Sequence, residues 1–135
     1  MRLADVYSVA DSACYLYALM LEREPHQNIS HKSVPTVAQH LGFVRSLPYR
    51  EWHLVIEESV GVVGATYISK QNEIGIFIFK AHRGRGYGRR AVEMLLERHR
   101  GQRLVANINP MNTDSQMFFT NLGAKLIQLT YEVPA

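Results

Sequence analysis

The sequence predicts one α/β domain of the α+β kind, built on a mixed, mostly antiparallel and twisted sheet. Its 135 residues, of which 47% are hydrophobic, suit a single compact core and leave little room for a second domain. Strand patterns precede, separate and follow the helical ones, and only one strand–helix–strand unit, in the second half, has the form of a parallel crossover. We therefore expect the order β-α-α-β-β-β-α-β-α-β over residues 1–135.

The chain should begin with a strand and a helix. Residues 1–7 form the predicted first strand. Asp11 can cap a helix through residues 12–23, because its short acidic side chain can accept hydrogen bonds from the first backbone amides of the helix. The helix should end before Pro25, since proline cannot continue it.

A second helix and a β-hairpin follow. Ser33 and Pro35 favour the N-cap and the first turn of a helix that ends near Pro48. Spacing predicts the buried face of this helix as Val37, Leu41 and Val44. Residues 52–69 then read as two strands joined by a turn near residues 59–61.

The second half should contain a central strand and the crossover. Residues 73–80 are apolar almost throughout, as in a strand buried on both faces. The next helix has one apolar stripe, formed by Gly88, Ala91, Val92, Leu95 and Leu96. A strand at 103–108, a helix at 112–122 closed by Gly123, and a last strand at 125–133 follow. In that last strand one face is formed by Ile127, Leu129, Tyr131 and Val133.

The stretch AHRGRGYGRR, residues 81–90, joins the apolar strand to this helix. A strand that ends in a glycine-rich turn and enters a helix directs several backbone N–H groups and the positive end of the helix dipole at one point. Glycine at 84, 86 and 88 lets an anion approach the backbone, and the neighbouring arginines add positive charge. The pattern is neither a P-loop nor the dinucleotide fingerprint, and an ordinary strand-to-helix connection is the less favoured interpretation.

Residues 83–88, Arg-Gly-Arg-Gly-Tyr-Gly, resemble the signature with which the GNAT family of N-acetyltransferases holds the pyrophosphate of acetyl-CoA. The stretches 73–96 and 106–127 resemble, in order and separation, that family's strand, loop and helix and its following strand and helix. With the hairpin, the resemblance covers roughly residues 52–130. It implies a GNAT-like fold and acetyl-CoA as the cofactor.

The resemblance also implies roles for individual residues. Ile76 and Ile78 would offer backbone groups to the pantetheine arm, and the N–H of Ile78 would polarise the thioester carbonyl. Asn112 matches an asparagine that contacts the cofactor. The expected cofactor-binding residues are Ile76, Phe77, Ile78, Arg83, Gly84, Arg85, Gly86, Tyr87, Gly88, Arg89, Asn112, Ser115 and Phe119.

The expected chemistry is direct attack of a free amine on the thioester. Glu73 matches a carboxylate that acts as base through a water, although an exposed strand-end glutamate is an equal interpretation. His53 is the alternative base, since histidine titrates near neutrality. Phe119 occupies the position of the family's tyrosine acid. Because a thiol has a pKa of about 8.5, releasing it as thiolate at pH 7 costs only about 2 kcal/mol, so we expect slower turnover rather than none.

A water, Ser115 or Tyr131 could replace that missing acid, and the sequence does not choose among them. The acceptor is expected to be a small-molecule primary amine. Residues 23–47 weakly resemble acetyltransferases of amino-sugar nucleotides. The expected substrate contacts are Tyr49, Trp52, His53 and Tyr131.

Three other functions remain open: a non-catalytic acyl-CoA sensor, which Phe119 would suit, a protein N-acetyltransferase, and a basic nucleic-acid-binding module. Seven of the fifteen basic residues lie between residues 83 and 103, and such a cluster suggests an anionic partner. Nucleic acid is the least favoured, because only Tyr87 lies among the arginines as an aromatic.

The sequence shows no signal peptide or apolar run of the roughly 20 residues that span a bilayer, so we expect a cytoplasmic protein without membrane contact. Its lone cysteine, Cys14, cannot form an internal disulfide, and no spacing suggests a metal site. The family usually has one more strand than we predict here. That strand is either missing or supplied by a partner chain, so a homodimer is one expectation.

Overall fold

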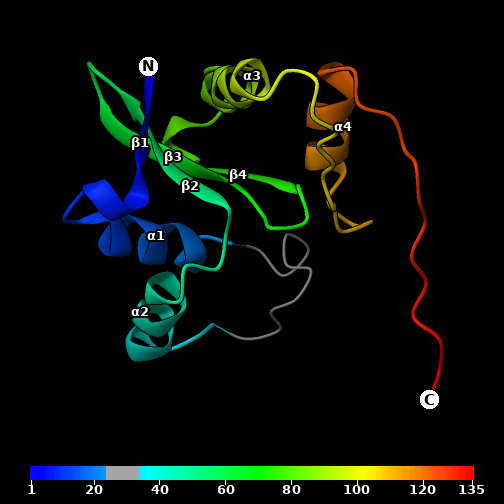
Figure 1. Ribbon diagram of the computed structural model, residues 1–135, viewed down its shortest axis with the longest axis horizontal. Helices are drawn as coiled ribbons and strands as arrows, with labels where there is room; N and C mark the ends of the chain where they lie inside the picture. Colours follow the sequence, from blue (N-terminus) through cyan, green and yellow to red (C-terminus); the bar gives the residue numbers. More distant parts are fainter. Residues whose placement is uncertain (24–33) are drawn as a thin grey trace.

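The computed structural model describes residues 1–23 and 34–135 of the chain. Its centre is an antiparallel four-stranded sheet in which neighbours in sequence are also neighbours in space (Figure 1). The strands are β1 (Arg2–Asp5), β2 (Glu51–Glu57), β3 (Gly61–Ile68) and β4 (Ile74–Ile78). The predicted α/β fold with a mostly antiparallel sheet is confirmed.

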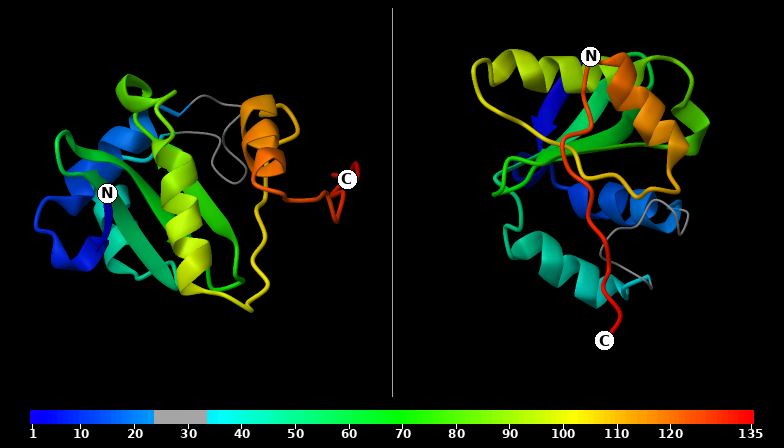
Figure 2. Two further views of the ribbon diagram at one scale, coloured as in Figure 1. Left: turned by 90° about the horizontal axis from the view of Figure 1, so that it is seen from above. Right: turned by 90° about the vertical axis from the view of Figure 1, so that its right-hand side faces the viewer.

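Helices cover both faces of this sheet. Helices α1 (Ser12–Leu21) and α2 (Val37–Arg45) pack on one face, and α3 (Tyr87–Arg98) crosses the other (Figures 1 and 2). Helix α4 (Thr113–Asn121) lies on the α3 side, beyond β4. Among the helices of the described ranges, none has both the length and the hydropathy of a membrane-spanning segment.

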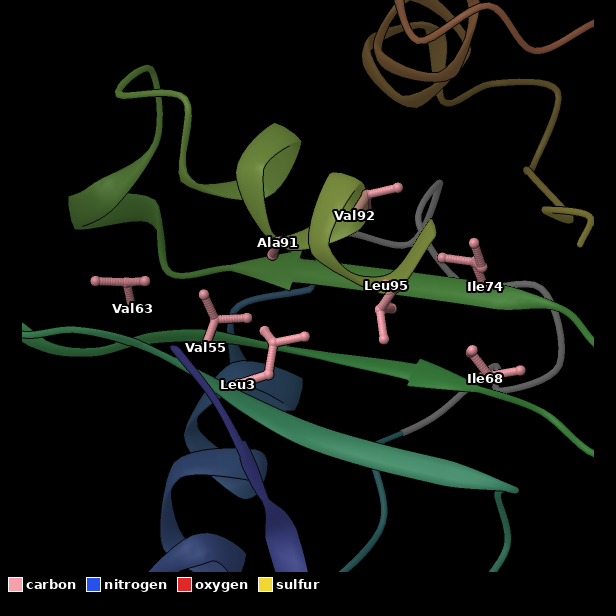
Figure 3. Close-up of a cluster of buried hydrophobic side chains, with 8 residues drawn as sticks. All are labelled: Leu3, Val55, Val63, Ile68, Ile74, Ala91, Val92 and Leu95. Atoms are coloured by element: carbon pink, nitrogen blue, oxygen red, sulfur yellow. The ribbon is translucent and has the colours of Figure 1, made fainter. Parts of the chain in front are cut away.

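Each face of the sheet has its own buried cluster. The cluster under α3 consists of Leu3, Val55, Val63, Ile68, Ile74, Ala91, Val92 and Leu95 (Figure 3). The cluster under α1 and α2 consists of Val6, Leu16, Leu19, Val44, Trp52, Leu54 and Ala65. Three members of the predicted helical stripe, all in α3, are thus buried, whereas Leu96 is exposed.

A β-bulge in β3 anchors the end of β4. The register changes so that Val55 opposes Gly64 while Ile56 opposes Val62, which leaves Val63 as the extra residue. The carbonyl of Val63 accepts a hydrogen bond of 2.9 Å from the amide of Phe79. The bulge therefore holds the residue from which the chain enters the glycine-rich turn.

The helix ends on the α1–α2 side differ in detail from the sequence-based expectation. Asp11 occupies the N-cap of α1, but its side chain makes no capping bond. Helix α2 is capped instead by Thr36, through a reciprocal capping box with Gln39. Val37 therefore lies in the exposed first turn, and His40 is buried in its place. The predicted boundary at Pro25 and the helix start at Ser33 lie outside the described residues.

Two predicted strands do not form. Of residues 103–108, only Val105 makes a bridge to the sheet, and it is parallel, as the crossover requires. Residues 125–133, which we call the tail, lie extended but pair with no strand of the described chain, because the tail runs clear of the sheet (Figures 1 and 2). Strand β4 is therefore the last strand of the sheet, not a central one.

His40 gives the fold a testable pH dependence. Its Nε2 donates to the carbonyl of Ala13 (3.3 Å), and its Nδ1 is buried without a hydrogen-bond partner in the described chain. Burial lowers the pKa of His40 below the ordinary 6.5, although the bond to Ala13 opposes this. Below about pH 6.5 the unfolded chain therefore binds a proton that the folded chain resists. The free energy of unfolding consequently decreases as the pH is lowered.

We expect the free energy of unfolding to fall more steeply between about pH 7 and pH 5 in the wild type than in His40→Gln. The slopes should differ by at most about 1.4 kcal/mol per pH unit, the limit for one titrating group. Urea unfolding at a series of pH values measures this. Equal slopes in the two proteins would show that His40 is not held neutral.

Candidate active site

The segment around Val105 pairs with β4 at one bridge only and then separates from it. The amide of Ile74 donates to the carbonyl of Val105 (2.7 Å), and the amide of Val105 donates to the carbonyl of Asn72 (3.0 Å). The bridge pairs Glu73 with Val105 and is isolated. Past this point the two segments are no longer paired, so no strand of the described residues covers the far edge of β4.

The open edge presents backbone groups of Ile76 and Ile78. In an antiparallel strand, successive amides point to opposite sides. Since Ile74 donates away from β3 and Phe79 donates toward it, the amides of Ile76 and Ile78 point to the open edge. That these two residues offer backbone groups to a pantetheine arm stays a prediction.

The glycine turn lies directly after β4. A short 3-10 turn (Lys80–His82) leads into Gly84 and Gly86, whose φ angles of +78° and +80° are in the left-handed region. A Cβ added at either glycine would meet no atom within 4 Å, so the space above both is open. Gly86 is the N-cap of α3 and offers no side-chain cap, so the first amides of the helix face this space without a capping partner.

Gly88 brings the start of α3 against β4. A Cβ at this position would lie 3.4 Å from Ile78 Cγ1, 3.5 Å from Phe118 Cε2 and 3.8 Å from Ile76 Cγ1. The helix therefore sits close to the strand at the level of its open edge. The uncapped amides of α3 and the unpaired amides of β4 form one continuous site, which we call the open-edge site.

The arginines of the turn are used unequally. Arg83 Nε donates to the carbonyl of Ile78 (3.0 Å) and so ties the turn back to the strand. Arg89 pairs with Glu93 (2.7 Å), and Arg90 pairs with Glu57 (3.3 Å). Arg85 takes part in none of the ion pairs found in the described ranges. Its charge remains available beside the open-edge site.

Glu73 is held in place at the opening of the sheet. Its Oε1 accepts from Ser69 Oγ (3.2 Å), and its Oε2 accepts from the side-chain Nδ2 of Asn107. Ser69 Oγ in turn accepts from the backbone amide of Glu73 (3.0 Å). Because Asn107 follows Val105 on the diverging segment, Glu73 stands where the two segments part. The sequence analysis did not identify Ser69 or Asn107.

A family model described as an acetyltransferase (GNAT) domain matches residues 7–125. The chain belongs to the GNAT acetyltransferase family. The resemblance inferred from the glycine turn is thereby confirmed, whereas the amino-sugar subtype is not tested by this match. No curated protein matches the sequence of this GNAT domain.

Solved structures agree with the fold of this GNAT domain. A transcriptional regulator from Bacillus halodurans C-125 superposes with a TM-score of 0.71 at 16% identity, over 99% of each chain. An acetyltransferase from Thermus thermophilus gives 0.69 at 20%, over 94% of this chain and 88% of the other. A phosphinothricin acetyltransferase from Sinorhizobium meliloti, in complex with AcCoA, gives 0.63 at 20%, over 90% and 72%.

On the α1–α2 side of the GNAT sheet, aromatic rings lie beside Glu73. The rings of Tyr49 and Tyr67 stack with centroids 3.9 Å apart and planes 6° apart. Burial raises the pKa of Tyr67; the Arg23 guanidinium opposes the rise and the Glu73 carboxylate adds to it. The same guanidinium lies 4.4 Å from the ring centroid of Phe77. Tyr49 was predicted from the sequence as a substrate contact, whereas Tyr67 was missed. The signal was its position two residues after the buried Ala65, which puts both side chains on the same face of β3.

Three predicted residues are not brought to the open-edge site. Trp52 is buried in the cluster under α1 and α2, so it is a core residue. His53 lies on internal strand β2, where its Nε2 is 3.0 Å from Glu51 Oε1, and the same carboxylate contacts His99 at the end of α3. Tyr131 is exposed on the tail. Trp52 and His53 lie on opposite faces of β2. The Trp52 ring packs edge-on against Tyr49 on the α1–α2 side, with centroids 4.8 Å apart, whereas His53 lies on the α3 side.

The start of α4 gathers two predicted residues. Asn112 is the buried N-cap, and its Oδ1 accepts from the amide of Ser115 (3.1 Å). Phe119 packs against the cluster under α3 and meets Phe118 edge-on, with centroids 5.0 Å apart. Phe118, which the sequence analysis passed over, is the ring beside Gly88.

Within the described ranges, no group of three or more His, Cys, Asp or Glu could hold a metal ion.

The contact between Gly75 and Tyr67 can be tested by adding one methyl group. Gly75 directly opposes Tyr67, and a Cβ there would clash with the tyrosine ring. We expect Gly75→Ala to cost about 1–3 kcal/mol by overpacking and to change the near-UV circular dichroism of the tyrosine pair.

The matched control is Gly42→Ala in α2, where an added Cβ meets nothing within 4 Å. Alanine should stabilise this helix position by roughly 0.5–1 kcal/mol. Denaturant unfolding compares the two variants. If both substitutions stabilised the protein equally, the tyrosine ring would not be packed on Gly75.

Proposed function

We propose that this GNAT domain transfers an acetyl group from acetyl-CoA to a primary amine by direct attack of the amine. The observation that carries the proposal is the open-edge site, where unpaired amides of β4 adjoin the uncapped first amides of α3. The phosphinothricin acetyltransferase with the same fold was solved in complex with AcCoA, which supports the choice of cofactor.

The residues of the open-edge site fit this cofactor. A diphosphate needs several N–H donors without side chains in the way. The backbone from Gly84 to Arg89 offers such donors, and the space above Gly84 and Gly86 is open. An extended arm that carries amides needs a strand edge with outward-pointing groups, and Ile76 and Ile78 offer one. Arg85 adds a charge with no ion-pair partner in the described chain. When bound, acetyl-CoA supplies an acetyl group activated as a thioester.

The chain's own residues would position and activate the reactants. The amide of Ile78 would donate to the carbonyl oxygen as negative charge develops there. The carboxylate of Glu73, held by Ser69 and Asn107, would take the proton that the attacking amine loses, directly or through a water. Fixing both carboxylate oxygens before the reaction limits the reorganisation needed during proton transfer.

The acceptor would approach on the α1–α2 side of β4, where Glu73 lies near the Tyr49–Tyr67 pair and Arg23. Aromatic faces and a guanidinium suit a planar or anionic amine, and an amino-sugar nucleotide is the proposed acceptor class. Much of the segment that weakly resembles such enzymes, residues 24–33, lies outside the described residues. A protein N-terminus is the other amine to be tested.

A non-catalytic acyl-CoA sensor is the second candidate, and Phe119 is the observation that favours it. Neither Phe119 nor its neighbour Phe118 can donate a proton to a departing thiolate. Thiolate is a good enough leaving group for slow turnover without an acid, as the cost of about 2 kcal/mol shows. The two candidates therefore share the cofactor site and differ in whether any amine is acetylated.

Gly86→Glu should abolish binding of coenzyme A while the protein stays folded. The carboxylate would enter the open space above the α3 amides, where it repels phosphate and competes for the same donors. We expect affinity, measured by titration calorimetry, to fall about 100-fold or more, which corresponds to about 2.8 kcal/mol.

Gly101→Glu is the matched control. Gly101 also has a left-handed φ (+83°) and open space around its Cβ position, but it follows α3 at the opposite end. Both variants carry the same charge change and similar backbone strain, of roughly 1–2 kcal/mol. Equal affinities in Gly86→Glu and Gly101→Glu would remove the proposed diphosphate site.

Glu73→Gln should lower kcat about 10²–10⁴-fold and leave the affinity for acetyl-CoA unchanged, because glutamine keeps an acceptor for Ser69 but cannot take a proton. The assay follows release of coenzyme A from acetyl-CoA with amino-sugar nucleotides, simple primary amines and peptides with a free N-terminus. The fastest acceptor is then used to compare variants.

Glu58→Gln is the control, since Glu58 is an exposed carboxylate that pairs with Arg2 at the far end of the sheet. Full activity in Glu73→Gln would exclude Glu73 as the base. Tight binding of acetyl-CoA without acetylation of any amine would instead favour the sensor.

A further inference from the structure

The end of α1 carries a side chain that is unfavourable for its own helix. Glu22 is the C-cap of α1, and its backbone amide donates to the carbonyls of Leu19 and Met20. A carboxylate destabilises this end of a helix, because the negative pole of the helix dipole lies there. A residue that conflicts with its local structure is expected to make a compensating contact elsewhere in the fold.

That contact is with the segment that leads from β4 into the glycine turn. Glu22 Oε1 accepts a hydrogen bond of 2.8 Å from the backbone amide of Lys80, 58 residues further along the chain. Lys80 begins the 3-10 turn, and Phe79, the N-cap of this turn, makes no side-chain capping bond. The carboxylate of Glu22 therefore satisfies an amide at the start of the turn that the local sequence leaves uncapped.

Two other bonds hold the same segment. The amide of Phe79 donates to the carbonyl of Val63 in β3 (2.9 Å), and Arg83 Nε donates to the carbonyl of Ile78 in β4 (3.0 Å). Both of these bonds join the segment to the sheet. Of the three, the bond to Glu22 is the one that comes from the α1–α2 side, so it fixes the segment in a direction that the sheet does not.

We propose that Glu22 is a positioning residue that holds the glycine turn in its cofactor-binding conformation. The inference rests on the proposed binding of coenzyme A at the open-edge site. A diphosphate needs the amides from Gly84 to Arg89 to converge on one point, whereas glycines by themselves allow many backbone conformations. By fixing the entrance of the turn, Glu22 raises the fraction of free molecules that are ready to bind, and the apparent affinity increases with that fraction.

The deciding comparison is between Glu22→Ala and Glu22→Gln. Both variants remove the charge from the end of α1, but glutamine keeps an oxygen that can accept from the amide of Lys80. We expect titration calorimetry to show that Glu22→Ala binds coenzyme A about 3–10-fold more weakly than Glu22→Gln, the effect of one hydrogen bond. Glu22→Gln should bind as the wild type does. Equal affinities in the two variants would overturn the proposal.

The variant Tyr7→Phe controls for a general loss of stability. Tyr7 Oη donates to the carbonyl of Val44 (2.7 Å), which is another long-range bond from a side chain to the backbone on the α1–α2 side. Its removal should lower the free energy of unfolding and leave the affinity for coenzyme A unchanged. If Tyr7→Phe weakened binding as much as Glu22→Ala, the role assigned to Glu22 would be wrong.

Backbone order parameters from ¹⁵N relaxation report on the turn in the protein without ligand. For residues 83–88 they should stay near about 0.85 in the wild type and in Glu22→Gln, and fall toward about 0.6 in Glu22→Ala. Equal order parameters in the two variants would also overturn the proposal. A wild type that does not bind coenzyme A would contradict the proposed cofactor site, and the order parameters would still decide whether Glu22 holds the turn.

Discussion

The end of backbone pairing after Val105 is the constraint on which the rest of the site depends. An antiparallel or parallel ladder satisfies amides on both edges of a strand, and here the pairing stops after one isolated bridge. The amides of Ile76 and Ile78 are left to find another partner, because unpaired backbone groups are costly when they are removed from water. A ligand that carries its own amides can replace the missing strand.

The second half of the site follows from glycine chemistry at the start of α3. Left-handed φ angles at Gly84 and Gly86 turn the chain sharply from β4 into the helix, and Gly88 lets the helix approach Ile78 closely. The helix N-terminus therefore arrives uncapped at the level of the open edge. The turn between β4 and α3 is short, so the open edge of the strand and the N-terminus of the helix lie side by side. Both can therefore contact the same ligand.

Much of this arrangement was predictable because it is local in sequence. The glycine turn, the strand before it and the helix after it lie within about 25 residues, and their patterns need no distant partner to be interpreted. The strands at 103–108 and 125–133 were predicted wrongly because a strand pattern records which side chains can be buried, whereas pairing needs a neighbour. The structure places His53 and Trp52 away from the open edge of β4, and their proximity in sequence could not indicate this. Phe118 and Asn107 needed the fold to bring them to β4.

The most direct measurement of the central claim is a titration of ¹⁵N-labelled protein with coenzyme A, followed by amide chemical shifts. The account predicts that the largest shifts occur at the backbone amides of Ile76, Ile78 and residues 84–89, with little change along the tail. Binding that moves amides elsewhere and leaves those of the turn and of β4 unchanged would contradict it.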